Sequence, residues 1–218
     1  STSDDSNVTL PNDASMINDT VLNSIHITEE DVLDQLQILD INKAQGPDGI
    51  SARLLKKAAK PISKILKHLF NLSLTSTTFP MNWKKANVIP VYKKGERSNI
   101  NNYRPVSLLS IVAKVFERII FKYVYNHFKA NFVISLNQSG FLPGHSTITQ
   151  LLEVYHKFCK AVDDGKEIRV IFLDISKAFD KVWHKGLLYK LQKCGIGGSL
   201  LMWFKSYLMD RQQRVCIN

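Results

Sequence analysis

Apolar residues recur at spacings of three and four along most of the sequence, the pattern of amphipathic helices. Thr28 is a good helix-capping residue and acidic residues follow it. Apolar positions from Val32 to Leu39 complete the pattern, so the stretch 25–39 predicts the start of a helix with Thr28 as its N-cap. The same reasoning predicts the other helices at 51–74 (with a second start near Pro61), 111–128, 148–162 (capped by Ser146 or Thr147), after Trp183 through Cys194, and 200–208.

Short runs that are rich in apolar and β-branched residues predict strands between these helices. Residues 86–92 predict a strand, and residues 93–97 predict the tip of a hairpin that continues into residues 100–109. Pro90 and Pro105 indicate exposed edges or bulges, because proline cannot donate a ladder hydrogen bond. The tail from residue 211 to residue 217 predicts the start of a further strand.

One apolar run differs from the others because it ends abruptly at a charge. Residues 170–173 are wholly apolar and Asp174 follows them directly, which predicts a strand buried on both faces. An acidic group at the end of such a strand is costly to bury without a partner, and a divalent cation is a natural partner. A lone strand-end aspartate also fits a phosphatase, a Walker B site or a surface carboxylate, so other motifs must decide between these classes.

Charge adds a second signal, because the net charge of +10 is unevenly spread. Residues 1–42 contain nine acidic residues and no lysine or arginine, whereas residues 43–133 contain 17 basic and three acidic residues. Residues 134–218 contain 12 basic and seven acidic residues. A basic middle of this strength fits contact with nucleic-acid phosphates, although a solvated lysine-rich surface has the same composition. The polar composition of residues 1–24 predicts a flexible or weakly ordered segment.

The sequence lacks the motifs of several other protein classes. Cys159, Cys194 and Cys216 are far apart and form no CxxC pair, so neither a zinc knuckle nor a disulfide framework is indicated. His145 beside Ser146 lacks the GxSxG elbow of a hydrolase. No apolar run approaches the roughly 20 residues of a membrane span, so we expect no membrane partner and an intracellular location, in the cytoplasm or nucleus. The chain opens without Met or a signal segment, as a fragment would.

Four separated motifs together resemble one family. The first is LDISKAFDKV at residues 173–182, which resembles the first catalytic-aspartate motif of reverse transcriptases, in particular those of non-LTR (LINE-type) retrotransposons. The others are KAQGPDGI at residues 43–50, which resembles the element before the fingers, VIPVYKKGERSNINNYRPVSLLS at residues 88–110, which resembles the fingers motif, and NQSGFLPGHST at residues 137–147, which resembles a template-side loop. The resemblance spans residues 38–218 in the family's order.

The resemblance implies a fold and a domain organisation. The expected fold is mixed α+β and right-hand polymerase-like, helix-rich with a few strands, with fingers and an incomplete palm. Residues 25–165 would form the N-terminal extension and fingers. Residues 166–218 would start the palm and stop before the second catalytic motif. Neither the Y-x-D-D hairpin nor the S-x-G-x-P-Q-G segment of the family occurs in this sequence.

The resemblance also implies an activity, RNA-directed DNA polymerisation, with RNA template, DNA primer and dNTP as partners. Two Mg²⁺ ions serve nucleotidyl transfer in the complete enzyme. Asp174 corresponds to a catalytic metal ligand, and the backbone carbonyl of Ile175 is a further ligand. Lys93 and Arg104 correspond to contacts with the triphosphate. We expect these two side chains to share a cleft with Asp174.

The sugar and the template have their own expected contacts. Phe179 corresponds to the aromatic ring under the incoming sugar, where it leaves no room for a 2′ hydroxyl, and the small Ala178 lets the substrate approach. Leu142 stands where the family commonly has arginine, which puts one phosphate or template contact in doubt. The residues expected to contact template are Lys94, which could exchange roles with Lys93, Gly46, Pro47, Asp48, Gln138, Gly140 and Phe141.

Two other functions stay open at this point. The chain could be a non-catalytic nucleic-acid-binding relic of a retroelement, or an unrelated metal-dependent phosphoryl-transfer enzyme, although the latter lacks a Walker A loop. Because carboxylates of the metal site are missing from the sequence, we expect residues 1–218 alone not to polymerise.

Overall fold

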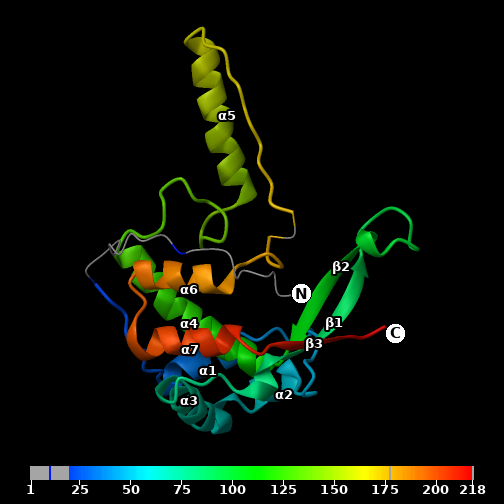
Figure 1. Cartoon of the computed structure of the whole chain (residues 1–218), viewed down its shortest axis with the longest axis vertical. Coiled ribbons are helices and arrows are strands. Elements are labelled where there is room, and N and C mark those ends of the chain that lie inside the picture. Colours follow the sequence, from blue (N-terminus) through cyan, green and yellow to red (C-terminus); the bar gives the residue numbers. More distant parts are fainter. Residues whose placement is uncertain (1–9, 11–19, 177, 218) are drawn as a thin grey trace.

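Helices form the body of the molecule, and a small sheet lies at one edge (Figure 1). The computed structural model describes residue 10, residues 20–176 and residues 178–217. Within them, no helix is long and apolar enough to cross a membrane. The helices are α1 (Glu29–Gln37), α2 (Ala52–Lys57), α3 (Ala59–Thr75), α4 (Ile111–Ala130), α5 (Thr147–Asp163), α6 (His184–Lys193) and α7 (Gly198–Leu208). The strands are β1 (Lys85–Tyr92), β2 (Tyr103–Leu109) and β3 (Gln212–Val215), and two 3₁₀ turns are η2 (Met81–Lys84) and η3 (Ile100–Asn102).

The predicted start of the first helix is confirmed. The Thr28 hydroxyl accepts a hydrogen bond from the Asp31 amide, and the Asp31 carboxylate accepts one from the Thr28 amide, which makes a capping box. Asp31 is buried, and its carboxylate also accepts hydrogen bonds from Lys122 (2.8 Å) and Tyr123 (2.7 Å) on α4. The acidic first helix is thereby fixed to the basic middle of the chain.

The core lies where α1, α3, α4 and α7 meet, and aromatic rings fill its centre. Phe70 and Phe116 stack with their centroids 4.4 Å apart, and Trp203 meets Phe116 edge-on at 5.2 Å. The Trp203 indole N–H donates to Ser73 Oγ at 3.0 Å, which satisfies the one polar atom of this buried ring. The predicted apolar stripes of α1, α3, α4 and α7 therefore face one common core, which also includes Phe79, whereas α5 has no buried residue.

The sheet has the order β2-β1-β3. β1 pairs antiparallel with β2 over its length, whereas β3 pairs parallel with β1 only from Lys85 to Val88. Pro90 lies opposite Pro105, beyond the reach of β3, so the two residues without an amide hydrogen face each other. The prolines thus mark the part of the hairpin that projects as a two-stranded ribbon (Figure 1).

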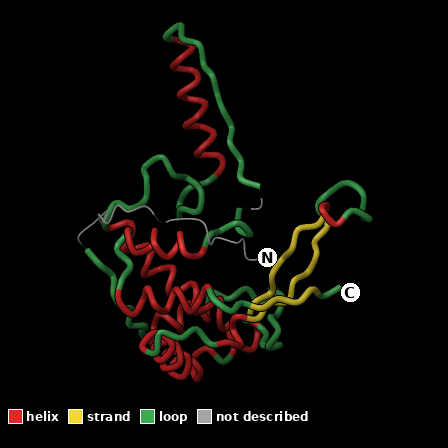
Figure 2. The backbone as a smooth tube through the Cα atoms, viewed as in Figure 1, coloured by secondary structure: helices red, strands yellow, loops and turns green. Residues whose placement is uncertain are grey.

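The strand predicted at residues 170–173 is wrong for this structure. These residues are drawn as loop where the chain returns beside α5 (Figure 2), and Ile171, Phe172 and Leu173 are 83%, 90% and 92% exposed. A strand needs a neighbouring backbone to exchange hydrogen bonds, and no described segment provides one here. The apolar run is extended and uncovered instead.

The prediction for the N-terminal segment can be compared with the structure only in part. Most of residues 1–24, which were predicted to be flexible, lie outside the described residues. The last of them are placed against the body: the Leu22 amide donates to Gly195 O at 2.8 Å, and the Gly197 amide donates to Leu22 O at 3.1 Å. Leu22 thereby forms a parallel bridge with Ile196, a long-range pairing that composition does not predict.

Candidate nucleotide and template site

The hairpin carries the cations predicted to hold a triphosphate. Arg104 lies opposite Val91 on the projecting ribbon, and the Lys93 amide continues the ladder by donating to Asn102 O at 2.8 Å. Lys93, Lys94 and Arg104 are exposed, and no ion pair within the described residues involves them. The ribbon therefore presents three solvated cations near its end, where an anion could reach them.

The tip of the hairpin is held by side chains rather than by strand pairing. The Asn102 side-chain Nδ2 donates to Glu96 O at 2.9 Å, and the Tyr103 hydroxyl donates to Arg97 O at 2.8 Å. The Arg97 guanidinium lies 5.2 Å from the ring centroid of Tyr92, a cation–π distance. These contacts give the basic tip a defined conformation.

The GPDG turn lies against the other end of the hairpin. The Gly49 amide donates to Gly46 O at 3.1 Å, and Asp48 Oδ1 accepts from the Ile50 amide at 3.2 Å. A Cβ on Gly46 would lie 2.5 Å from the backbone of Leu109, so only glycine permits this approach. Of the predicted template residues here, Gly46 has a packing role and is buried, whereas Asp48 is exposed.

The loop before α5 holds the remaining predicted template residues. Gln138 donates through its side chain to Gly140 O at 3.1 Å, and Ser146 caps α5 as predicted. Phe141 has a left-handed backbone (φ 63°), which is unusual for a bulky residue, and its ring is exposed. The loop and the start of α5 line a cavity of about 540 Å³ that includes Gly140 and Phe141.

Asp174 lies in the exposed segment that follows α5. Asp174, Ile175, Ala178 and Phe179 are all exposed. Among the described residues, no group of three or more His, Cys, Asp or Glu side chains is arranged to hold a metal ion. Five cavities of the described part have neither Asp174 nor the hairpin cations among their lining residues. The expected shared cleft is therefore not among them.

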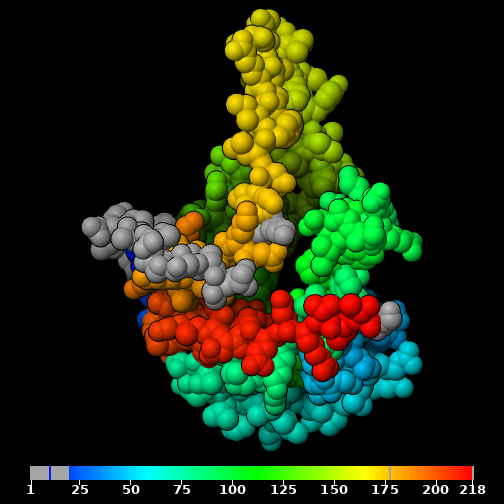
Figure 3. Space-filling model, turned by 45° about the vertical axis from the view of Figure 1, so that its right-hand side comes forward, coloured from blue at the N-terminus to red at the C-terminus, as the bar shows by residue number. Residues whose placement is uncertain are grey.

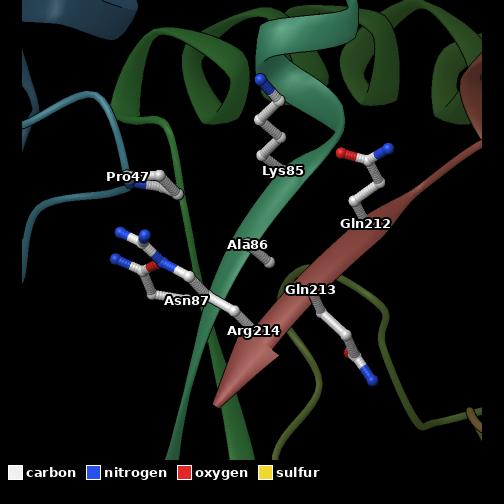
Figure 4. Close-up of a pocket in the computed structure, with 7 residues that line it drawn as sticks. All are labelled: Pro47, Lys85, Ala86, Asn87, Gln212, Gln213 and Arg214. Carbon is white, nitrogen blue, oxygen red and sulfur yellow. The ribbon is translucent and has the colours of Figure 1, made fainter. Parts of the chain in front are cut away.

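One polar pocket was not predicted from the sequence. It has a volume of about 320 Å³ and lies where β3 joins the start of β1 (Figure 4). The Arg214 Nε donates to Asn87 Oδ1 at 2.8 Å, beside Pro47 of the GPDG turn. Alternation of polar and apolar residues at the start of β1 was the available signal, but the parallel pairing with β3 was not foreseeable. The lining residues of this β1–β3 pocket are Pro47, Lys85, Ala86, Asn87, Gln212, Gln213 and Arg214.

Comparison with known proteins gives an independent result. A family model described as reverse transcriptase (RNA-dependent DNA polymerase) matches residues 91–218. The chain is 32% identical over 189 residues to the probable RNA-directed DNA polymerase from transposon BS of Drosophila melanogaster, covering 85% of this chain and 20% of that protein. It is 32% identical over 193 residues to the RNA-directed DNA polymerase from mobile element jockey of the same species, covering 88% and 21%.

A third relative agrees with these two. The probable RNA-directed DNA polymerase from transposon X-element of Drosophila melanogaster is 34% identical over 172 residues, which cover 78% of this chain and 19% of that protein. The matched residues place the chain in the class of template-directed polymerase domains. The chain belongs to the reverse transcriptase family, with relatives from non-LTR retrotransposons, as the four motifs indicated. It spans about a fifth of the length of these relatives.

Proposed function

We propose that the chain forms the fingers and the first part of the palm of a right-hand polymerase that extends a DNA primer on an RNA template. Residues 25–165 are assigned to the N-terminal extension and fingers, and residues 166–218 to the start of the palm. The observation that carries the proposal is the LDISKAFDKV motif at residues 173–182 within the region that matches reverse transcriptases. The mixed fold of helices with a small sheet is compatible with it.

In this proposal the hairpin binds the incoming triphosphate. Arg104 offers a planar fork that can hydrogen-bond two phosphate oxygens, whereas Lys93 offers a mobile point charge. Both are exposed on the same ribbon, and Tyr92 and Tyr103 pair edge-to-face between them with centroids 5.7 Å apart. The two-stranded ribbon projects from the body without a third strand beside its outer half, so it is free to bend toward a substrate.

Asp174 and Ile175 are assigned to the metal site. A carboxylate and a backbone carbonyl are the hard oxygen donors that Mg²⁺ prefers, so these residues fit the ion in kind. The described residues do not complete such a site, and the remaining carboxylates are assigned to other parts of the complete protein. When bound, two Mg²⁺ ions activate the primer 3′ oxygen and stabilise the leaving pyrophosphate.

Phe179 and Ala178 are assigned to the sugar. The Phe179 ring is 82% exposed, so it is available to lie under an incoming nucleotide. An apolar ring offers a 2′ hydroxyl no hydrogen-bond partner and fills the space that it would need. This selects deoxynucleotides by a modest factor, about 10²-fold as for other apolar pockets that reject a hydroxyl.

The proposal is tested with primer extension by the complete protein on a primed RNA template. We expect dNTP incorporation in Mg²⁺ that a chelator abolishes, and no incorporation by residues 1–218 alone, since the metal site is incomplete among the described residues. Salt-dependent RNA binding without any incorporation by the complete protein would contradict the proposal. That result would favour a non-catalytic nucleic-acid-binding relic.

A further inference from the structure

Helix α3 has apolar residues on two sides, and only one side is buried. The buried side includes Phe70 and Leu74, which belong to the core. Ile65, Leu69 and Leu72 are instead 60%, 42% and 53% exposed. Their spacing of four and three residues places them in one row along the helix. An exposed apolar row of this kind is a candidate docking surface.

Positive charge lies beside this apolar row. Lys64, His68 and Leu72 follow one another at intervals of four residues, so they are neighbours on the helix surface. Residues 52–75, which span α2 and α3, contain six lysine or arginine residues and no acidic residue. No ion pair of the described residues involves any of these six. We define the outer face of α3 as six exposed residues, Pro61, Lys64, Ile65, His68, Leu69 and Leu72.

The neighbours of α3 lie on its buried side. The Ser63 hydroxyl donates to the Glu29 carboxylate of α1 at 3.0 Å, and the Trp203 indole of α7 donates to Ser73 at 3.0 Å. Figure 1 and Figure 3 show α3 at the lower end of the body, away from the tip of the hairpin. None of the five cavities of the described part is lined by a residue of the outer face. The outer face is therefore an open surface, which suits a macromolecule better than a small ligand.

The residue types of the outer face favour a protein over nucleic acid. Single-stranded nucleic acid stacks its bases on aromatic rings, but Phe70, the one phenylalanine, tyrosine or tryptophan of α2 and α3, is buried. Helices that lie in a membrane surface also use exposed tryptophan or phenylalanine. Phosphate groups can pair with Lys64 but gain nothing from Ile65. An amphipathic helix with acidic residues along its edge satisfies both, because its apolar side covers the row and its carboxylates face the lysine.

We propose that the outer face of α3 docks an acidic amphipathic helix of a partner protein. Ile65, Leu69 and Leu72 have the i, i+4, i+7 spacing that helices use to pack against one another. Three side chains cover much less than the roughly 800 Å² per partner of a stable interface, so the contact is weak and reversible. Exposed charge makes it sensitive to salt. This surface lies outside the proposed polymerase site, so the inference does not depend on the proposed function.

The test is equilibrium binding of a labelled synthetic peptide to the 218-residue chain, measured by fluorescence anisotropy. The peptide is a helix of about 20 residues with leucine on one side and glutamate on the other. Ile65→Gln/Leu69→Gln is expected to weaken binding at least about tenfold, because two buried anchors are lost. The control Phe132→Gln/Leu136→Gln changes two residues that are 89% and 99% exposed elsewhere, and should alter affinity less than about twofold. Lys64→Gln is expected to weaken binding about two- to threefold and to reduce its salt dependence.

A second peptide of the same composition, with its leucines spread evenly around the helix, should not bind. Equal binding of both peptides would show charge attraction alone and would overturn the proposal. Equal losses in the two double variants, or no binding of the first peptide up to about 1 mM, would overturn it as well.

Two further measurements keep the inference falsifiable. If the outer-face variant does not fold, a photoreactive leucine in the peptide is crosslinked to the unmodified chain, with labels expected within residues 61–72. Labels that lie only elsewhere would contradict the proposal. The complete protein should bind the same peptide, since failure to bind would show that the outer face is covered within that protein. Displacement of the peptide by single-stranded RNA or by anionic vesicles at lower concentrations would assign the face to those partners instead.

Discussion

The ring of Phe141 lies 6.4 Å from the ring of Phe179, in an edge-to-face arrangement at 84°. The two residues come from the loop before α5 and from the LDISKAFDKV motif, and both rings are largely exposed. Aromatic pairs at this distance and angle are favourable by about 0.5–1.5 kcal/mol beyond the area that they bury. The structure thus brings a predicted template residue into contact with a predicted sugar-binding residue.

Replacement of Phe179 should relax sugar selection. Phe179→Ala removes the apolar wall under the sugar, so the preference for dNTP over rNTP in kcat/KM is expected to fall by up to about 10²-fold. The measurement is single-nucleotide incorporation by the complete polymerase. Phe132→Ala is the control, because it removes an exposed ring that is assigned to no part of the site and is expected to leave the preference unchanged. Unaltered discrimination in Phe179→Ala would show that the ring does not contact the sugar.

Replacement of Arg104 should weaken dNTP binding. Arg104→Lys keeps the charge but removes the planar fork, so KM for dNTP is expected to rise about tenfold, as for the loss of a charge-assisted hydrogen bond. Arg97→Lys is the control on the same hairpin, since Arg97 lies over Tyr92. A change of KM that is equal in both variants would contradict the specific role of Arg104.

The close approach of Gly46 to Leu109 predicts a stability effect. A Cβ on Gly46 would lie 2.5 Å from backbone atoms that no rotamer change can move, so Gly46→Ala is expected to lower the free energy of unfolding by about 1–3 kcal/mol. Gly140→Ala is the control, because a Cβ there meets nothing within 4 Å. Urea denaturation of the 218-residue chain measures both. Equal stability of the two variants would show that the GPDG turn does not pack against the backbone of Leu109.

The Asp31 cluster predicts loss of stability in acid. Burial raises the pKa of the Asp31 carboxyl, but hydrogen bonds from Lys122, Tyr123 and Thr28 outweigh burial and lower its pKa to about 2. The ordinary value is 3.8, so this stabilisation is complete above about pH 4 and is lost as pH falls toward 2. It amounts to about 2 kcal/mol.

The Asp31→Asn variant should lack this contribution to the pH dependence of its unfolding free energy. It should also be less stable than the unmodified chain at neutral pH. Asp40→Asn is the control, because the Asp40 carboxylate makes only exposed contacts, an ion pair with Lys43 at 3.7 Å and a hydrogen bond from the Asn42 amide at 3.0 Å. Stability of the unmodified chain that stays constant from pH 5 to pH 2, measured by urea denaturation, would refute the role of the cluster.

Local signals in the sequence predicted much of the fold. The helices and the hairpin follow from apolar spacing, from caps such as Thr28 and Ser146, and from turn residues, each of which acts over a few residues. β3 was also predicted as a strand, but its parallel partner β1 is distant in sequence. No local pattern specifies such a partner, so the β1–β3 pocket was missed.

For residues 170–173 the sequence predicts a buried strand that the structure does not contain. Its apolar composition correctly signals a surface that prefers burial, but composition does not say what covers it. In this structure no described strand lies beside it, and Asp174 is consequently exposed. The residue assignments of the nucleotide site therefore rest on the family motifs, while the positions of Lys93 and Arg104 on one ribbon come from the structure.

The most direct measurement is RNA-templated primer extension by the complete protein carrying Asp174→Asn, with Asp180→Asn as the matched control. Both carboxylates are exposed and lie in the same motif, but only Asp174 is assigned to the metal site. We expect Asp174→Asn to reduce dNTP incorporation by at least about 10³-fold, because a ligand of the catalytic ions is lost, while RNA binding is kept. Asp180→Asn should retain most of the activity. Undiminished extension by Asp174→Asn, or equal losses in the two variants, would contradict the account.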